Sequence, residues 1–401
     1  MKYPITPEYL DSIPSNVVRI YQSLEDKLIK EICSRLRVGG VANEVVLNDI
    51  RVLRERGISQ ERIDSLIMEH MKMGRAELEK IYADAVEWNQ RYYDWAIDKA
   101  VLTAPVVPFT WEAAQEAVDA IARQTSAEFE NLTQTTAFSV RLAGKKTELV
   151  KPQDIFYRVL DDAEIRIRSG GMSYNEAIAQ GVKQLAASGL RRVDYESGHS
   201  DQLDVAVRRA VITGVSQMSD QYAKMAGERL ETHYWEISAH SGARDKPGPS
   251  PWSSHKDWQG KVYSERSGDI YPNIYTVCGL GEVDGLGGAN CRHRRYPFVL
   301  GVTERSYTDT ELEHIDDGLG CSFEGKKYTA YEATQMQRRI ERTIRAHERE
   351  RLACEKAGLE DEAKLEQIRL RRLRKKYKAF SETAGLPQQR ERMKVQYLDD
   401  K

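Results

Sequence analysis

The stretch THYWEISA, residues 232–239, divides the chain into parts of different character. Its aromatic and β-branched residues alternate with others, a pattern that predicts a β-strand. Before it, apolar residues such as Val17, Ile20 and Leu24 recur every three or four positions, which predicts amphipathic helices. After it, residues 241–297 are rich in Gly, Pro, Ser and Asp, which predicts a unit dominated by loops. The first half should therefore be nearly all α, with a change of structure at this strand.

Further signals extend this division to the whole chain. Short strands are predicted at 261–264 and 296–302. The first half is predicted to be helical, with separate helices at 59–73 and 76–100 and a later helical stretch that continues through Phe138. The fold class is mainly α with a small α+β domain. The predicted segments are an N-terminal helical module at 1–105, a second helical region at 106–230, an α+β unit at 231–305, a connector at 306–330 and a charged helical C-terminal arm at 331–401. Gly358 and the acidic residues after it predict a turn between two helices of the arm.

Composition excludes several classes of protein. The 401 residues include 60 Lys and Arg against 62 Asp and Glu, and 30% of the residues are charged. No apolar run approaches the roughly 18 residues of a transmembrane helix, and the first residues lack the layout of a signal peptide. The five cysteines are an odd number spread thinly, which does not describe a disulfide framework. We therefore expect no contact with membranes, and folding in a reducing cytosol.

Soft metal ligands gather in the loop-rich unit. Four side chains could together bind tetrahedral zinc: His255, Cys278, Cys291 and His293. One residue separates Cys291 from His293, whereas structural zinc sites usually place two to four between paired ligands. The spacing therefore favours the packing of a satisfied histidine and buried thiols, with no cofactor, over a zinc site.

The same region could carry enzyme chemistry. It offers two acid–base pairs and two thiol nucleophiles: His255 with Asp257, His240 with Asp245, Cys278 and Cys291. No G-x-S-x-G, H-E-x-x-H or phosphate-loop motif accompanies them. We therefore predict no catalytic residues. A metal-dependent hydrolase or nuclease that uses His255, Cys291 and His293 is the alternative function.

The order of features in this unit resembles a known domain. A tryptophan-containing strand, a polar segment ending in His255 and Gly260, and a closing Cys291-Arg292-His293 before an apolar strand look like the Mu F-like phage head-morphogenesis domain. That domain commonly closes with Cys-Arg-Cys. Longer strings, SAHSGARDKPGPSPWSSHKDWQGKVYS and GLGGANCRHRRYPFVLG, are similar to the phage minor capsid protein 2 family, as is the helix opened by YEATQMQRRIER. The resemblance extends from about Ala206 to the C-terminus.

This resemblance implies a structural role rather than an enzyme. It implies a minor capsid protein of a tailed bacteriophage, present in few copies, associated with the portal or the inner capsid, and assisting head morphogenesis or DNA delivery. The implied partners are the portal protein and the major capsid protein. The implied location is the virion, assembled in the cytoplasm of the host bacterium.

A basic decapeptide, RLRRLRKKYK at residues 369–378, stands out in the C-terminal arm. Clustered cations bind DNA by displacing counterions from phosphates, so packaged double-stranded DNA is one candidate partner. The residues that would contact it are Arg369, Arg371, Arg372, Arg374, Lys375, Lys376 and Lys378. The other interpretation, which we favour, is a solvated helix face, because Leu370, Leu373 and Tyr377 recur at helical spacing and predict that one side packs.

Overall fold

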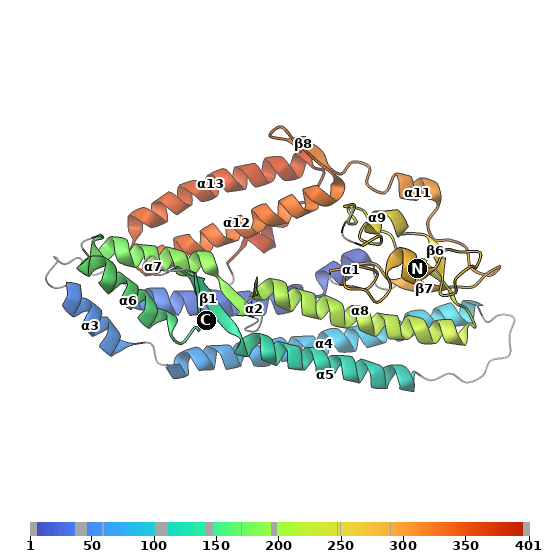
Figure 1. Cartoon of the computed structure of the whole chain (residues 1–401), viewed down its shortest axis with the longest axis horizontal. Helices are drawn as coiled ribbons and strands as arrows, with labels where there is room; N and C mark the ends of the chain where they lie inside the picture. Colours follow the sequence, from blue (N-terminus) through green and yellow to red (C-terminus); the bar gives the residue numbers. More distant parts are fainter. Residues whose placement is uncertain are drawn as a thin grey trace.

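Long helices lie along the major axis of the protein and give it an elongated shape (Figure 1). The computed structural model describes residues 6–36, 46–57, 60–100, 111–141, 147–169, 171–193, 199–246, 248, 250–288 and 290–395. The proposed boundary at residue 105 lies outside these ranges. No helix among the described residues has the length and apolar character needed to cross a bilayer.

The N-terminal part is a layer of helices. Its elements are α1 (Pro7–Ser12), α2 (Ser15–Arg35), α3 (Val46–Arg56), α4 (Gln60–Ala100) and α5 (Glu112–Gln134), and α8 (Leu203–Arg229) runs beside α4 and α5 (Figure 1). The prediction of two helices between residues 59 and 100 was wrong, because α4 continues through Gly74. A Cβ atom on Gly74 would lie 2.9 Å from the ring of Tyr21 on α2, so this glycine allows two helices to approach closely.

A small sheet interrupts this helical half. Strands β1 (Thr136–Val140), β2 (Glu148–Val150), β3 (Leu190–Val193) and β4 (Ser200–Gln202) form an antiparallel sheet in the order β2-β1-β3-β4. Helices α6 (Ile155–Arg168) and α7 (Tyr174–Ser188) connect β2 to β3. The prediction of helix through Phe138 was wrong, because Phe138 lies in β1, where it pairs with Val150 of β2 and Leu190 of β3. The fold class, mainly α with small sheets, is confirmed.

The predicted α+β unit has the strands expected of it. Strands β5 (Tyr234–Ile237), β6 (Val262–Ser264) and β7 (Arg295–Phe298) form an antiparallel sheet in the order β6-β5-β7. The short helices α9 (His255–Trp258) and α10 (Ile274–Cys278) lie in its loops. A Cβ on Gly227 of α8 would lie 2.5 Å from the indole of Trp235, so this glycine lets the sheet dock on the long helix. The guanidinium of Arg295 covers the same indole at 4.3 Å.

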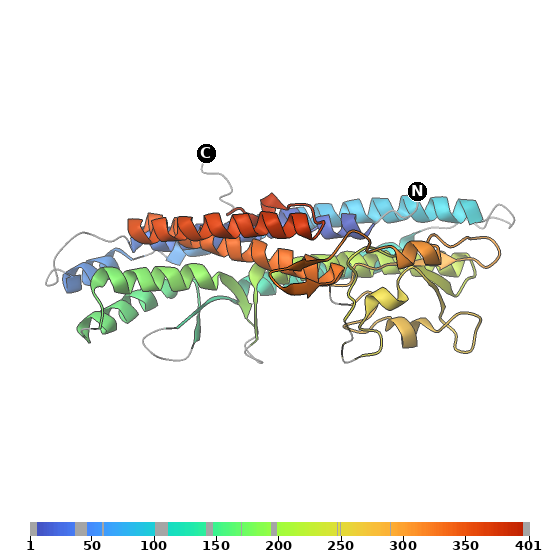
Figure 2. The same ribbon diagram turned by 90° about the horizontal axis from the view of Figure 1, so that it is seen from above.

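The C-terminal arm is a helical hairpin that packs back on the N-terminal helices. After α11 (Asp309–Glu313) and the strand pair β8 (Cys321–Phe323) and β9 (Lys326–Tyr328), the chain forms α12 (Ala330–Lys356), α13 (Glu360–Thr383) and the 3-10 helix η1 (Arg390–Met393). The predicted turn at Gly358 is confirmed; its φ is 74°. Helix α12 packs on α13, α7 and α2. Seen from above, the two main sheets lie on one side of the helical layer (Figure 2).

Buried ion pairs fasten the arm to the body. Arg345 of α12 donates to Asp204 of α8 at 2.7 Å and to Glu25 of α2 at 2.9 Å, and Arg349 also pairs with Glu25. The same carboxylate accepts from the backbone N–H of Leu190 at 2.6 Å. Because each of these buried charges has a partner, the contact fixes one arrangement of α2, α8 and α12.

Candidate metal centre

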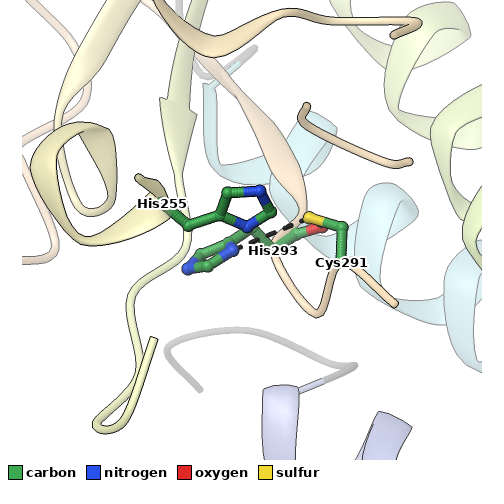
Figure 3. Close-up of side chains that lie close together, drawn as sticks. All are labelled: His255, Cys291 and His293. Carbon is green, nitrogen blue, oxygen red and sulfur yellow. Dashed lines mark hydrogen bonds between the residues drawn. The ribbon is translucent and has the colours of Figure 1, made fainter. Parts of the chain in front are cut away.

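Three of the four predicted metal ligands lie together. One nitrogen from each of His255 and His293 and the sulfur of Cys291 are all within 4.8 Å of one another (Figure 3). The three side chains are 3%, 1% and 1% exposed, so the group lies inside the α+β unit.

The fourth predicted ligand, Cys278, does not join them among the described residues. It ends α10 and is fully buried, next to Tyr263. Burial raises the pKa of the Cys278 thiol, which keeps it protonated at neutral pH.

The sheet places Cys291 and His293 immediately before β7. The backbone N–H of Ser238 donates to Arg294 O at 2.8 Å, and the Arg294 N–H donates to the Ser238 hydroxyl at 2.9 Å. These bonds continue the β5–β7 pairing by one residue. His293 is therefore held at a fixed register on the edge of the strand pair.

The glycine-rich loop and α9 position His255. Gly279 ends α10 with a φ of 60°, and a Cβ there would lie 2.4 Å from the Trp252 ring. The indole N–H of Trp252 and the hydroxyl of Ser253 donate to the two carboxylate oxygens of Asp284 at 2.8 and 2.9 Å. With its side chain fixed in this way, Asp284 presents its backbone carbonyl to His255 Nε2 at 2.9 Å.

Gln259 orients His293. Its Oε1 lies 3.0 Å from His293 Nε2 and also accepts from the backbone N–H of His240 at 3.0 Å. On the other side of the ring, His293 Nδ1 is 3.7 Å from the sulfur of Cys291. The His240 ring stacks on His293 with centroids 4.6 Å apart, and its Nδ1 lies 2.8 Å from Ser241 O.

Burial and neighbouring charges set the protonation of the site. Burial and the nearby cationic groups lower the pKa of His293 well below its usual value, and burial with the charge of Arg292 lowers the pKa of His240 to about 3. Burial alone would raise the pKa of Cys291, but the neighbouring His255 ring and the charge of Arg294 outweigh it and lower that pKa. The site therefore combines neutral imidazoles at His240 and His293 with a thiol inclined to ionise, the forms that bind metals.

The two acid–base pairs considered from the sequence are not formed. The His255 ring contacts the Asp284 carbonyl and not Asp257, and the His240 ring contacts the Ser241 carbonyl and not Asp245. Within the described part of the chain, Asp245 Oδ1 is buried without a hydrogen-bond partner. A cavity of about 210 Å³ beside His293 is lined by Arg294, Ser216 and the glycine loop.

Sequence reasoning missed the residues that orient the site. Gln259 contacts His293, 34 positions away, through its side-chain oxygen, and Asp284 contacts His255, 29 positions away, through its backbone carbonyl. Neither a single glutamine nor a backbone carbonyl gives a signal for such a contact in the sequence. It also missed a second group, His347, Glu350 and Glu366, which the α12–α13 hairpin brings together. His347 and Glu350 share a helix face, but the contact of His347 with Glu366 at 2.7 Å depends on the hairpin.

The basic residues of 369–378 occupy α13 and divide into two sets. Four of them pair with carboxylates: Arg369 with Glu366, Arg374 with Glu348, Lys376 with Glu324 and Lys378 with Glu382. Arg371, Arg372 and Lys375 are exposed, and no ion pair is recorded for them within the described residues. Leu370 and Tyr377 are buried, so one side of the helix packs as the spacing predicts.

Comparisons with known proteins bear on this architecture. The family model described as phage minor capsid protein 2 matches residues 5–382. A structural protein of Lactococcus phage LL-H is 26% identical over 327 residues, which covers 79% of this chain and 80% of that protein. A structural protein of Lactococcus phage mv4 is 36% identical over 127 residues, 31% of this chain and 92% of that protein. No solved structure matches.

Proposed function

The chain belongs to the phage minor capsid protein 2 family, and from this premise we propose that it enters the head of a tailed phage in few copies and binds the portal protein. A phage structural role follows from the family and from its relatives, which are structural proteins of phages. The finer proposal adds that it contacts the major capsid protein at the inner shell. It further adds that the protein joins the virion in the host cytoplasm and assists head morphogenesis or DNA delivery.

The burial of the His255, Cys291 and His293 group supports a structural role over a hydrolase or nuclease. A polymeric substrate must reach a catalytic metal, which keeps an open coordination position. These three side chains are at most 3% exposed, and among the described residues the rings of His240 and His255 contact backbone carbonyls rather than a carboxylate of the kind that orients a general base. The geometry suits holding the fold more than turning over a substrate.

Exposed indoles on α4 support binding to another protein. Trp88 and Trp95 are 41% and 45% exposed and lie one heptad apart, so they share a helix face. Tryptophan is enriched where protein interfaces gain most of their energy, and its exposure on a free surface leaves apolar area in water. We assign this face to the contact with the portal.

Coexpression tests this proposal. The chain is tagged and coexpressed with the portal and major capsid proteins of the phage that encodes it. We expect the portal protein to be recovered with the chain, and the variant carrying Trp88→Ala and Trp95→Ala to recover at least about tenfold less, since losing interface tryptophans typically costs about 2 kcal/mol or more each.

Met68→Ala provides the matched control, because Met68 is a 57% exposed apolar residue on the same helix. It should recover as much portal protein as the unmodified chain. A folded, soluble chain that recovers neither portal nor capsid protein would contradict the proposal. If the double tryptophan variant recovers as much portal protein as the unmodified chain, the interface does not include this face of α4.

The exposed basic residues of α13 favour a second role, contact with packaged double-stranded DNA. Arg371, Arg372 and Lys375 carry charges that no recorded ion pair within the described residues offsets. Such charges bind phosphates without base contacts. The chain as a whole has a net charge of −2, so DNA binding would depend on this local face.

A further inference from the structure

Every imidazole at the centre of the α+β unit is held by an oxygen on the side away from its neighbours. His255 Nε2 faces the Asp284 carbonyl at 2.9 Å, His293 Nε2 faces Gln259 Oε1 at 3.0 Å, and His240 Nδ1 faces the Ser241 carbonyl at 2.8 Å. Histidines that bind a metal almost always donate their other ring N–H to such an oxygen.

These oxygens fix the tautomers of His255 and His293. A backbone carbonyl can only accept, so His255 Nε2 must donate to Asp284. Gln259 Oε1 accepts from the backbone N–H of His240, so the amide cannot be turned to present its NH₂ group there, and His293 Nε2 must also donate. In its neutral form, each of the two imidazoles therefore carries its lone pair on Nδ1.

Two Nδ1 lone pairs, those of His255 and His293, then face a single thiol proton, that of Cys291. His293 Nδ1 faces Cys291 Sγ at 3.7 Å, and a ring nitrogen of His255 lies within 4.8 Å of the same sulfur. One thiol proton can serve only one of the two nitrogens, whether it stays on sulfur or moves to His255. A nitrogen lone pair buried without a donor costs free energy, and a cation that accepts all three lone pairs removes that cost.

We propose that His255 Nδ1, His293 Nδ1 and Cys291 Sγ bind a zinc ion. Two imidazoles and one thiolate are ligands that suit zinc in a tetrahedral site. The fourth position falls to His240, whose ring stacks on His293 and whose Nε2 carries its lone pair, or to water from the adjoining cavity. The inference stands apart from the proposed function, since either could fail alone.

Such an ion would join three segments of the unit. The ligands come from α9, from the end of the glycine-rich loop and from the residue pair before β7. The strands of this sheet are only three or four residues long, so their backbone pairing alone gives little independent stability. A zinc ion would fix the loops that the short strands cannot hold.

Metal analysis of the full chain, purified under reducing conditions, tests the site. We expect one zinc per chain by mass spectrometry. Replacement by Co²⁺ should give the near-ultraviolet absorption of a cobalt–thiolate bond and the visible bands of tetrahedral cobalt. A strong chelator should lower the thermal unfolding midpoint, and added Zn²⁺ should restore it.

Variants separate a metal ligand from a packing residue. Cys291→Ser should abolish the thiolate absorption, whereas Cys321→Ser, which changes a cysteine outside the group, should leave it intact. Gln259→Leu should weaken zinc binding by about 10- to 100-fold through loss of the oxygen that orients His293, and Gln259→Glu should retain most of the affinity.

The unmodified chain alone can overturn the inference, even if Cys291→Ser fails to fold. A folded chain that holds no zinc and develops no thiolate absorption with excess Co²⁺ would show that these side chains only pack. Thiolate absorption that survives in folded Cys291→Ser would place the metal at another cysteine.

Discussion

At the scale of single residues, Asp11 shows how one carboxylate connects distant parts of the chain. It accepts from Arg208 of α8, Arg338 of α12 and Arg392 of η1. Burial alone would raise its pKa, but these arginines and Arg292 lower it from 3.8 to about 2. Because the folded state holds the ionised form, this contribution is complete above about pH 4 and is lost as the pH falls toward 2.

The pH dependence of Asp11→Asn tests this account. The substitution removes the titrating charge and leaves the arginines uncompensated, so it should destabilise the protein at pH 7. The loss relative to the unmodified chain should be smaller at pH 3 by about 1 kcal/mol, as linkage requires for a shift of this size. Urea unfolding at the two pH values measures it.

Asp361→Asn is the control, because the Asp361 side chain is 91% exposed and pairs only with Lys364. Its effect should be small at both pH values. An equal loss for Asp11→Asn at pH 7 and pH 3 would show that Asp11 does not titrate with a lowered pKa.

Residue types predicted the site in part. Histidine and cysteine in a loop-rich unit made His255, Cys291 and His293 candidate ligands, and the structure brings these three together. They equally identified Cys278, which the fold places beside Tyr263. Ligand type is recorded in sequence, whereas the direction of a side chain depends on pairings such as that of Ser238 with Arg294.

At the scale of elements, periodicity predicted helices well and short strands unevenly. Strand β5 lies within 232–239, where aromatic and β-branched residues indicated it correctly. Strand β1 has five residues with four of them buried, so it lacks alternation and was read as the end of α5. Gly74 was interpreted as a helix boundary, because Tyr21, the side chain that it faces, lies on another helix and gives no signal in the sequence around residue 74.

The exposed face of α13 makes a prediction about DNA. Neutralising Arg371, Arg372 and Lys375 to Gln should weaken binding to double-stranded DNA. The slope of log affinity against log salt should become shallower by about 2 to 3, because each phosphate contact contributes about 0.9. Fluorescence anisotropy over a salt series measures both quantities.

The matched control neutralises three arginines on other helices: Arg51, Arg75 and Arg91. It changes the net charge equally, and we expect it to leave the salt slope unchanged. The same loss in both variants would indicate a response to net charge alone. Unchanged binding after the α13 substitutions would rule out this face.

At the scale of the whole molecule, the sequence predicted a helical arm but not where it packs. An amphipathic stripe records that one face is buried and does not identify the partner. Here α12 lies on α2 and α7, held by Arg345 and Arg349 on Glu25, so residues more than 300 positions apart share one buried contact. One hydrophobic core includes buried residues from α2 to the start of α13 and from the α+β unit.

This shared core has a consequence for assembly. The loops of the α+β unit and the outer faces of α4 and α13 surround a body whose helices are tied together by buried charges. Such a body can present several contact faces in a fixed relation to one another, which suits a component placed between larger rings or shells.

The most direct measurement is the copy number of this chain in purified virions of its own phage, by quantitative mass spectrometry against the portal and major capsid proteins. We expect the chain in numbers comparable to the portal protein and far below the major capsid protein, and we expect it to remain with the portal when heads are disrupted. Its absence from virions, when infected cells contain it, would contradict the account.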